Sequence, residues 1–378
     1  MLCCKKIITS ESVGIGHPDK ICDQIADLIL DECLKQDENS RVACEVFASS
    51  KTITIAGEIT TKAYVDVVKC AWKVLKPLGY LENDFRILLD INAQSSDIAK
   101  KVNLNKNIIG AGDQGIVFGY ACDETPQYLP LSLVLSNEFL LKLTNLIKTK
   151  KLLGYLYDMK SLVSIDYQNE KKPQIYSIVL SVQHVKNKKN SVIKKEIENN
   201  VINPVLKAHN LSSKCKKYIN YAGDFINGGL FADTGLTGRK IIVDTYGSIA
   251  NHGGGSFSGK DYTKVDRTGA YFARYIAKNI VAAKLAKRVQ VQLTFCIGLS
   301  RPILLHIETY GTNLISNEKI FSAVLKTFNF DLYNIIKMLG LKKPIYHLTS
   351  VFGHFGKKNL PWEKLDKVDI LKKISRSE

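Results

Sequence analysis

The sequence predicts an α+β fold in which antiparallel-rich sheets are covered on one face by helices. Apolar and polar residues alternate over residues 176–182 and again over 291–297, which is the period of half-buried strands. Apolar residues at helical spacing follow the first of these segments, at 191–209, and precede the second, at 270–287. Strands with one polar face beside helices with one apolar face are typical of α+β proteins that pack in layers.

The length of the chain bears on its domain organisation. A chain of 378 residues with 45% hydrophobic residues can bury a large core, and this length suggests two or three domains. Three segments are natural units of the sequence: 3–100, 111–229 and 231–371. No internal sequence repeat relates them.

Cysteine usage and hydropathy favour a cytoplasmic protein. The nine cysteines include no C-x-x-C pair and fall mostly within helical or strand patterns, which favours reduced, buried thiols. No apolar run is long enough for a signal peptide or a membrane span. We therefore expect no membrane partner.

The net charge of +17 raises the question of nucleic-acid binding. Lysine- and asparagine-rich clusters, such as residues 186–190 and 214–217, lack aromatic interleaving and any nucleic-acid motif. A lysine-rich bias on solvated surfaces explains them, so no specific nucleic-acid partner is expected. A basic RNA-binding protein stays as the non-enzyme alternative.

Near the N-terminus, the pattern predicts a helix whose first turn could bind an anion. Apolar residues recur at helical spacing from position 21 to 29, which predicts an amphipathic helix from Asp19 to about Gln36, and Pro18 suits the first turn. His17 and Asp19 then lie at the positive end of the helix dipole, beside a flexible glycine turn. Alternatively, Asp19 is a helix cap and His17 a surface residue.

The segment from 233 to 267 carries the strongest chemical signal. Basic residues alternate there with carboxylates, and glycines let backbone N–H groups approach a ligand closely. Fixed cations, exposed amides and metal-binding oxygens suit a nucleotide triphosphate, so this segment predicts a polyphosphate site. The charged residues are Arg239, Lys240, Lys260, Lys264 and Arg267, with Asp233, Asp244, Asp261 and Asp266.

Two other interpretations of these glycines are open. Residues 254–260 spell G-x-x-x-x-G-K, but Asp261 follows where a P-loop has Ser or Thr, and the apolar run 241–243 is separated from the glycines. A P-loop is therefore disfavoured. A solvated glycine-rich hairpin whose charges face water is the second alternative.

Several long motifs occur along nearly the whole chain. They are Ser10-Glu-Ser-Val13, Gly16-His-Pro-Asp-Lys20, Gly57-Glu-Ile-Thr-Thr61, Gly110-Ala-Gly-Asp-Gln-Gly115, Phe118-Gly-Tyr-Ala121, Gly235-Leu-Thr-Gly-Arg-Lys-Ile-Ile-Val-Asp-Thr-Tyr-Gly247, residues 252–267, Gly353-His-Phe-Gly356 and Pro361-Trp-Glu-Lys364. In composition and in order, these motifs resemble those of the S-adenosylmethionine synthetase (methionine adenosyltransferase) family.

The resemblance implies a fold, an assembly and a reaction. It implies three similar α+β units in a pseudo-threefold arrangement with interleaved segments, and a homodimer or homotetramer with active sites at the dimer interface. In the implied reaction, methionine sulfur attacks C5′ of ATP, and the expelled triphosphate is hydrolysed to phosphate and diphosphate. The thioether is already a nucleophile, so catalysis would consist of positioning and electrostatics. A degraded homologue that hydrolyses nucleotides is the alternative.

The resemblance also implies roles for individual residues. His17 would lie near the leaving oxygen as the chief catalytic side chain, together with Lys160, Lys240 and Lys260. Phe225 would stack on adenine, although a lone Phe is more often core packing. The implied ATP-binding set is His17, Asp158, Lys160, Phe225, Asp233, Arg239, Lys240, Ser256 and Lys260; the methionine-binding set is Glu58, Gln94, Asp233 and Lys264.

Metal ions are implied as well. Asp19 and Asp266 resemble the family's Mg²⁺ ligands, two ions per site, and hard oxygen ligands with phosphates suit that ion. Glu45 resembles the ligand of one K⁺ per subunit, or is a surface residue of an ordinary strand.

The chain departs from the family pattern at three places. Ile15 stands where the family usually has Glu, and Asp224 stands where it usually has Arg before the Phe. The segment 99–109 corresponds to the mobile gating loop but is shorter and basic. Because Asp224 reverses the charge, the resemblance implies no nucleotide contact at this position. The altered loop suggests an altered turnover.

Overall fold

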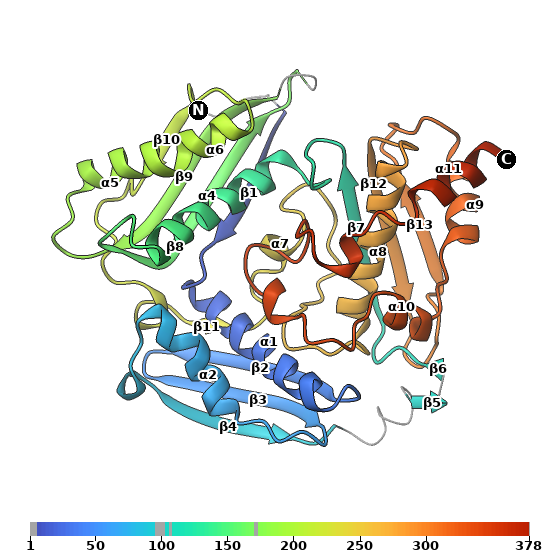
Figure 1. The fold of residues 1–378 in the computed structure, drawn as a ribbon, viewed down its shortest axis with the longest axis horizontal. Coiled ribbons are helices and arrows are strands. Elements are labelled where there is room, and N and C mark those ends of the chain that lie inside the picture. The colour runs from blue at the N-terminus through green and yellow to red at the C-terminus, as the bar shows by residue number, and fades with distance from the viewer. Residues whose placement is uncertain (1–5, 95–102, 106–107, 170–172, 378) are drawn as a thin grey trace.

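The computed structural model describes residues 6–94, 103–105, 108–169 and 173–377. These residues form three sheets of three or four strands, each covered by helices on one face, and a separate two-stranded sheet (Figure 1). Most strand pairs are antiparallel, and only β3/β4 and β9/β10 are parallel among the pairs in the described part of the chain. The predicted α+β class is confirmed.

The first sheet has the order β11-β2-β3-β4, with α1 and α2 packed on one face (Figure 1). Its inner face and the apolar side of α1 share one core. The bounds are β2 (Arg41–Ser49), β3 (Thr52–Thr60), β4 (Arg86–Asn92), β11 (Gly235–Leu236), α1 (Pro18–Gln36) and α2 (Val67–Leu75).

The second sheet has the order β1-β8-β9-β10 and has its own apolar core under α4, α5 and α6. A π-helical turn at Glu198–Ile202 joins α5 to α6, so the helix predicted at 191–209 forms in two pieces. The bounds are β1 (Ile7–Val13), β8 (Tyr155–Asp166), β9 (Gln174–His184), β10 (Lys216–Ile219), α4 (Leu131–Lys148), α5 (Asn190–Ile197) and α6 (Asn203–Ala208).

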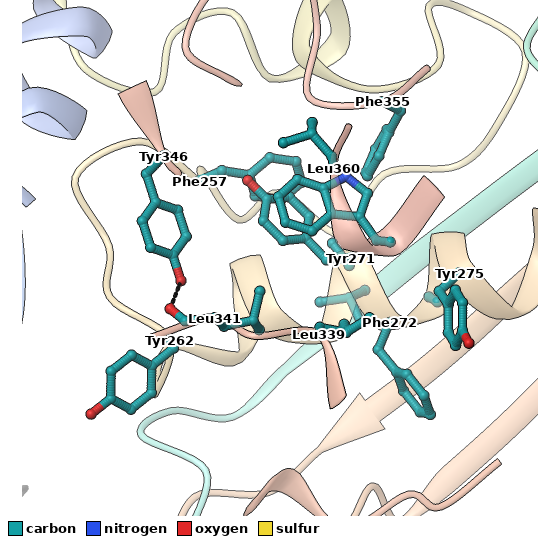
Figure 2. Close-up of a cluster of buried hydrophobic side chains, with 14 of the residues drawn as sticks. Phe257, Tyr262, Tyr271, Phe272, Tyr275, Leu339, Leu341, Tyr346, Phe355 and Leu360 are labelled. Atoms are coloured by element: carbon teal, nitrogen blue, oxygen red, sulfur yellow. Dashed lines mark hydrogen bonds between the residues drawn. The ribbon is translucent and has the colours of Figure 1, made fainter. Parts of the chain in front are cut away.

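The third sheet has the order β13-β12-β7 and packs against α8. Aromatic side chains of α8, including Tyr271 and Phe272, lie in a cluster with Phe257 and Phe355 (Figure 2). The bounds are β7 (Gly115–Cys122), β12 (Arg288–Phe295), β13 (Leu304–Glu308), α8 (Val265–Ala282), α9 (Asn317–Thr327), α10 (Leu332–Met338) and α11 (Val368–Ser377).

Helix α8 begins five residues earlier and ends five earlier than predicted. Its first turn contains Arg267 and Thr268, which are polar but fully buried, so the apolar pattern alone missed them. The helix stops before Lys284, whose φ of 60° lies in the left-handed region. The strands predicted at 176–182 and 291–297 correspond to β9 and β12.

Each sheet contains strands from distant parts of the chain. β1 joins a sheet of central strands, β11 joins a sheet of N-terminal strands, and β7 pairs with β12. The division into 3–100, 111–229 and 231–371 stays a prediction. Of the loop 99–109, residues 99–102 and 106–107 lie outside the described residues, and β5 (Asn103–Asn105) pairs with β6 (Ile108–Ile109).

Within residues 6–94, 103–105, 108–169 and 173–377, no helix is both long and apolar enough to cross a bilayer.

A candidate anion site at the start of helix α1

Helix α1 begins where the sequence predicts, with Pro18 in its first turn. The N-cap residue is His17, not Asp19: its Nδ1 accepts the backbone N–H of Asp19 at 3.2 Å. This hydrogen bond requires Nδ1 to be unprotonated, so the proton of the neutral ring is on Nε2. His17 therefore presents one N–H donor at the positive end of the helix.

The charge state of His17 follows from its surroundings. Burial lowers its pKa to about 4, and the positive charge of Lys240 adds to this effect. The imidazole is therefore neutral at physiological pH. It can donate a hydrogen bond to developing negative charge, but it does not supply a positive charge.

Asp19 connects α1 to the segment that contains β11 and the two basic residues after it. Its Oδ1 accepts the N–H of Leu236 at 3.0 Å, and its Oδ2 accepts Lys240 Nζ at 2.6 Å. Arg239 Nε lies 3.7 Å from the same carboxylate. Two predicted cations thus lie at the start of α1, beside His17.

The glycine turn before α1 is attached to β8. Gly14 and Gly16 donate their N–H groups to the carbonyls of Met159 and Tyr157, at 2.8 and 3.0 Å. The turn therefore lies against the part of β8 that contains Asp158 and Lys160.

Asp158 and Lys160 have different roles on this strand. Asp158 Oδ2 accepts the N–H of Gly229 at 2.7 Å, and burial raises the pKa of this carboxyl. Lys160 Nζ pairs with Glu11 at 3.0 Å, and both side chains are partly exposed. Asp158 thus holds the backbone at Gly229 in place, whereas the Lys160 side chain is accessible to a ligand.

Two further predicted ligands lie near this cluster. Asp233 is exposed, and its negative charge acts on both His17 and Asp158. Phe225 is half-buried, and its N–H donates to His184 Nε2 at 3.0 Å. Asp224, beside it, is exposed.

A second cluster of charged residues lies beside β2. Lys260 forms an isolated β-bridge with Ala43, and its Nζ donates to Asp266 Oδ2 at 2.6 Å. Lys264 Nζ lies 2.7 Å from Asp261 Oδ2. These cations lie next to the first residues of β2.

The remaining predicted residues lie on the same sheet. Glu58 pairs in register with Ala43, and Glu45 lies two residues along β2, so both are on the face that α1 and α2 leave uncovered. Burial raises the pKa of Glu45, and Lys260 opposes this effect. The N–H of Gln94 donates to Thr60 Oγ1 at 2.8 Å.

The two clusters contact different parts of β2. β11, whose Leu236 binds Asp19, pairs with Phe47, whereas Lys260 pairs with Ala43. Four residues of an extended strand span about 13 Å. The chain thus brings the predicted residues together in two groups, which we call the His17 cluster and the Lys260 cluster.

Three charged residues of the predicted polyphosphate segment are part of the interior instead. Arg267 is 1% exposed and pairs with Asp27, Asp244 is buried against Lys20, and Asp261 accepts the N–H of Val42. The expectation that they face a ligand is wrong, because each has a buried partner remote in sequence.

The P-loop alternative does not fit the structure. The run 241–243 lies in the short helix α7 (Ile241–Asp244), not in a buried strand, and residues 254–260 end in turns before α8. The solvated-hairpin alternative fits only part of this segment: Gly254 is exposed with open space around it, whereas Gly255 lies against the Asp266 side chain and Gly259 against the backbone of Cys44.

The metal predictions rest on single carboxylates. Among the described residues, no group of three or more His, Cys, Asp or Glu could hold an ion by itself. Asp19 and Asp266 lie in different clusters, and each is paired with a lysine. One carboxylate completed by phosphate oxygens and water is a donor set that Mg²⁺ accepts.

One departure from the family pattern has a structural explanation. Ile15 is 7% exposed, and its carbonyl accepts Gln24 Nε2 at 2.7 Å. An apolar side chain therefore suits this position.

Sequence reasoning missed a set of buried aspartates in α1 that bind backbone near the site. Asp23 accepts the N–H of Gly238, and Asp27 accepts the N–H of Gly259. A signal was present, because aspartates recur every four residues from Asp19 to Asp31.

Comparison with known proteins identifies the family. Three family models match the chain: S-adenosylmethionine synthetase N-terminal domain over residues 5–103, central domain over 108–225 and C-terminal domain over 227–364. The chain belongs to the S-adenosylmethionine synthetase family.

Individual relatives match over nearly their whole length. The S-adenosylmethionine synthase of Mycoplasmopsis pulmonis is 51% identical over 372 residues, which cover 98% of this chain and 99% of the relative. That of Mycoplasma mycoides subsp. mycoides is 49% identical, with 98% of each chain covered. That of Treponema denticola is 46% identical, with 97% of each covered.

Proposed function

We propose that this chain is a methionine adenosyltransferase that converts ATP, L-methionine and water into S-adenosylmethionine, phosphate and diphosphate. The observation that carries the proposal is the His17 cluster: a neutral imidazole donor at a helix N-terminus, with Lys240 and Arg239 beside it. Membership of the S-adenosylmethionine synthetase family supports the same reaction.

The first step needs electrostatic stabilisation more than acid–base chemistry. A lone pair of the methionine sulfur forms a bond to C5′ of ATP, and the C5′–O bond breaks with its electrons on the triphosphate oxygen. His17 Nε2–H would donate to that oxygen as negative charge develops there. Lys160, Arg239 and Lys240 would bind the triphosphate as a clamp.

The second step is hydrolysis of the bound triphosphate. Water adds to a terminal phosphorus, the P–O bond breaks, and phosphate and diphosphate leave. Lys260 and Ser256 would help to retain the triphosphate during this step. Ser256 lies beside Gly238, next to Arg239, and the preceding residue, Gly255, lies beside Asp266.

The methionine subsite would use charges of both signs. Asp233 or Glu58 would bind the ammonium group, and Lys264 and Gln94 the carboxylate. Phe225 would stack on adenine, and Asp158 would bind close to it.

Metal ions would assist both steps. Asp19 and Asp266 would hold two Mg²⁺ ions together with phosphate oxygens, and Glu45 would hold K⁺. When bound, these cations neutralise phosphate charge. Lys240 and Lys260, which now pair with the two aspartates, would be freed to contact phosphate.

The separation of the two clusters favours a dimer with active sites at the interface. One subunit would contribute its His17 cluster and its partner the Lys260 cluster, so two complete sites form per dimer. The uncovered face of the first sheet carries exposed apolar residues, including Phe47 and Leu88, which both pair with Thr54 and are 44% and 47% exposed. Such a face suits association with a second copy, as a dimer or as a dimer of dimers.

Mass spectrometry tests the proposal directly. The purified protein is incubated with ATP, methionine, Mg²⁺ and K⁺, and S-adenosylmethionine, phosphate and diphosphate are measured. We expect S-adenosylmethionine only when methionine is present. ATP that stays intact, or that is hydrolysed without methionine, would instead indicate a degraded homologue or a nucleotide hydrolase.

A further inference from the structure

Four aspartates form a line along helix α1, at intervals of four residues. Such residues lie on one ridge of a helix surface. All four are buried, and each accepts at least one backbone N–H from a segment more than 200 residues away. The pairs are Asp19 with Leu236, Asp23 with Gly238, Asp27 with Gly259, and Asp31 with Tyr346 and His347.

Asp23 holds the loop that presents Arg239 and Lys240. Its Oδ1 accepts the N–H of Gly238 at 2.9 Å, directly before Arg239. Its Oδ2 accepts Lys20 Nζ at 2.9 Å, and the same ammonium group donates to Asp244, at the end of α7. The segment 238–244 is therefore attached to α1 at both ends.

Asp27 holds the loop that presents Lys260 in the same way. Its Oδ1 accepts the N–H of Gly259 at 2.8 Å and Arg267 Nη1 at 2.7 Å. Arg267 Nη1 also donates to the carbonyl of Lys260 at 3.2 Å. The backbone on both sides of the Lys260 side chain is thus fixed by one buried ion pair.

The two glycines in these contacts leave their loops little freedom to shift. Gly238 and Gly259 have φ values of 78° and 79°, which favour glycine. A Cβ atom at Gly238 would lie 2.5 Å from Ser256 Cβ, and one at Gly259 would lie 2.0 Å from the carbonyl oxygen of Cys44. The loops are packed against neighbours as well as bound to α1.

We propose that Asp23 and Asp27 are positioning residues, which hold the two loops that bind the triphosphate so that Arg239, Lys240 and Lys260 are preorganised. This inference rests on the proposed function of the same site. The physical reason is that cations stabilise developing charge best when they need no reorganisation, and a shift of about 1 Å can lower a rate by about 100-fold.

Asp31 provides a matched control. It lies on the same ridge and accepts two backbone N–H groups at 2.9 Å, from Tyr346 and His347. That segment contains no residue assigned to ATP or methionine. A purely structural role for the aspartates predicts that Asp23 and Asp31 behave alike.

The test compares Asp23→Ala, Asp23→Asn and Asp31→Ala in the full-length protein. We measure kcat and KM for ATP, thermal unfolding, and the affinity for a non-hydrolysable ATP analogue. We expect Asp23→Ala to lower kcat/KM for ATP about 10- to 100-fold well below its unfolding temperature. Asp23→Asn should recover part of this loss, because its amide oxygen still accepts the N–H of Gly238. Asp31→Ala should lower the unfolding temperature and leave kcat/KM within about twofold.

Equal losses of kcat/KM in Asp23→Ala and Asp31→Ala, or none in either, would overturn the inference. If Asp23→Ala does not fold, Asp23→Glu replaces it, because Glu keeps the charge beside Lys20 but moves the acceptor away from Gly238. The inference then requires Asp23→Asn to be more active than Asp23→Glu, and the reverse order contradicts it.

A wild-type protein that makes no S-adenosylmethionine would refute the proposed function instead. The affinity for the ATP analogue then decides the inference, since it needs no turnover. Weaker binding in Asp23→Ala than in Asp31→Ala supports the positioning role, and equal affinities refute it.

Discussion

Helices α1 and α8 both bury lines of charged side chains, but the charges have opposite sign and bind different parts of the chain. The aspartates of α1 accept backbone N–H groups from the loops around Gly238 and Gly259. In α8, Arg274 donates to the carbonyls of Tyr120, Gln127 and Tyr128 and pairs with Glu363. The helices meet at the Asp27–Arg267 ion pair.

The difference lies in what the fixed segments contain. Segments bound to α1 include the assigned cations Arg239, Lys240 and Lys260, whereas those bound to Arg274 and Lys278 include no assigned ligand. Both sets obey the same rule, because a buried charge is tolerated only when it is paired and hydrogen-bonded. Substitutions in α8 beyond its first turn should therefore reduce stability alone. Substitutions of the α1 aspartates, or of the cations in the loops that they bind, should also reduce activity.

The largest expected effect is on stability, from Arg274→Ala. This change removes five hydrogen bonds and leaves the buried Glu363 carboxylate with one cation, Lys278, and the N–H of Gly356. Breaking a buried pair in this way costs about 3–5 kcal/mol of unfolding free energy. Urea unfolding measures the loss, and kcat per folded molecule should be unchanged. A stable Arg274→Ala variant with low kcat would remove the distinction between the two helices.

A matched pair of lysine substitutions sharpens the comparison. Lys240→Met removes a cation beside Asp19, and Lys278→Met removes one beside Glu363. We expect Lys240→Met to lower kcat/KM about 100-fold or more by loss of charge stabilisation. Lys278→Met should cost roughly 1–3 kcal/mol of stability with kcat/KM within a factor of about three. Steady-state kinetics and urea unfolding of both variants, in parallel, measure the two effects. A loss of kcat/KM in Lys278→Met but not in Lys240→Met would contradict the assignment of Lys240.

The start of α1 provides a pH test, because its N-cap residue is a histidine. The pKa of His17 is about 4 in the folded chain, against a usual value near 6.5. Between these values the unfolded chain binds a proton that the folded chain does not, so stability falls as pH falls, by about 1.4 kcal/mol per pH unit. His17→Asn should lose stability less steeply from pH 6.5 to 5. Identical slopes for the two proteins in urea unfolding would show that His17 is not held neutral.

The smallest expected effect is at a partly exposed ion pair, which serves as a reference for both helices. Lys217, in β10, places its Nζ 2.6 Å from Glu198, and the two side chains are 16% and 40% exposed. Lys217→Ala should change stability by less than about 1 kcal/mol and leave activity unchanged, because solvent screens such pairs. Thermal unfolding measures this change in stability. A loss of stability greater than about 1 kcal/mol would mean that this ion pair is unsuitable as a reference.

Much of the local structure could be predicted from sequence. The period of the apolar residues located α1, β9 and β12 to within a few residues, because each pattern needs only neighbours in the chain. The prediction was less accurate for α8, where buried polar residues such as Arg267 break the apolar pattern. The π-turn after α5 has no clear local signal.

The candidate site was only partly predictable. His17, Asp19 and Lys240 lie together, as the motifs suggested. The sequence did not indicate that Lys260 and Asp266 would lie at the other end of β2, since strand pairing determines that distance. The exposed position of Asp224 also leaves its effect on nucleotide binding for experiment.

By itself, the sequence determined the α+β class, the family and the residue types that the chemistry needs. The tertiary structure alone decided which charges are available to a ligand and which belong to the interior. Arg267 and Lys260 are both cations of one glycine-rich segment, yet Arg267 is buried against Asp27, 240 positions away, and Lys260 is partly exposed. The reason is physical: the cost of burying a charge depends on its partner, and contacts between distant segments supply that partner.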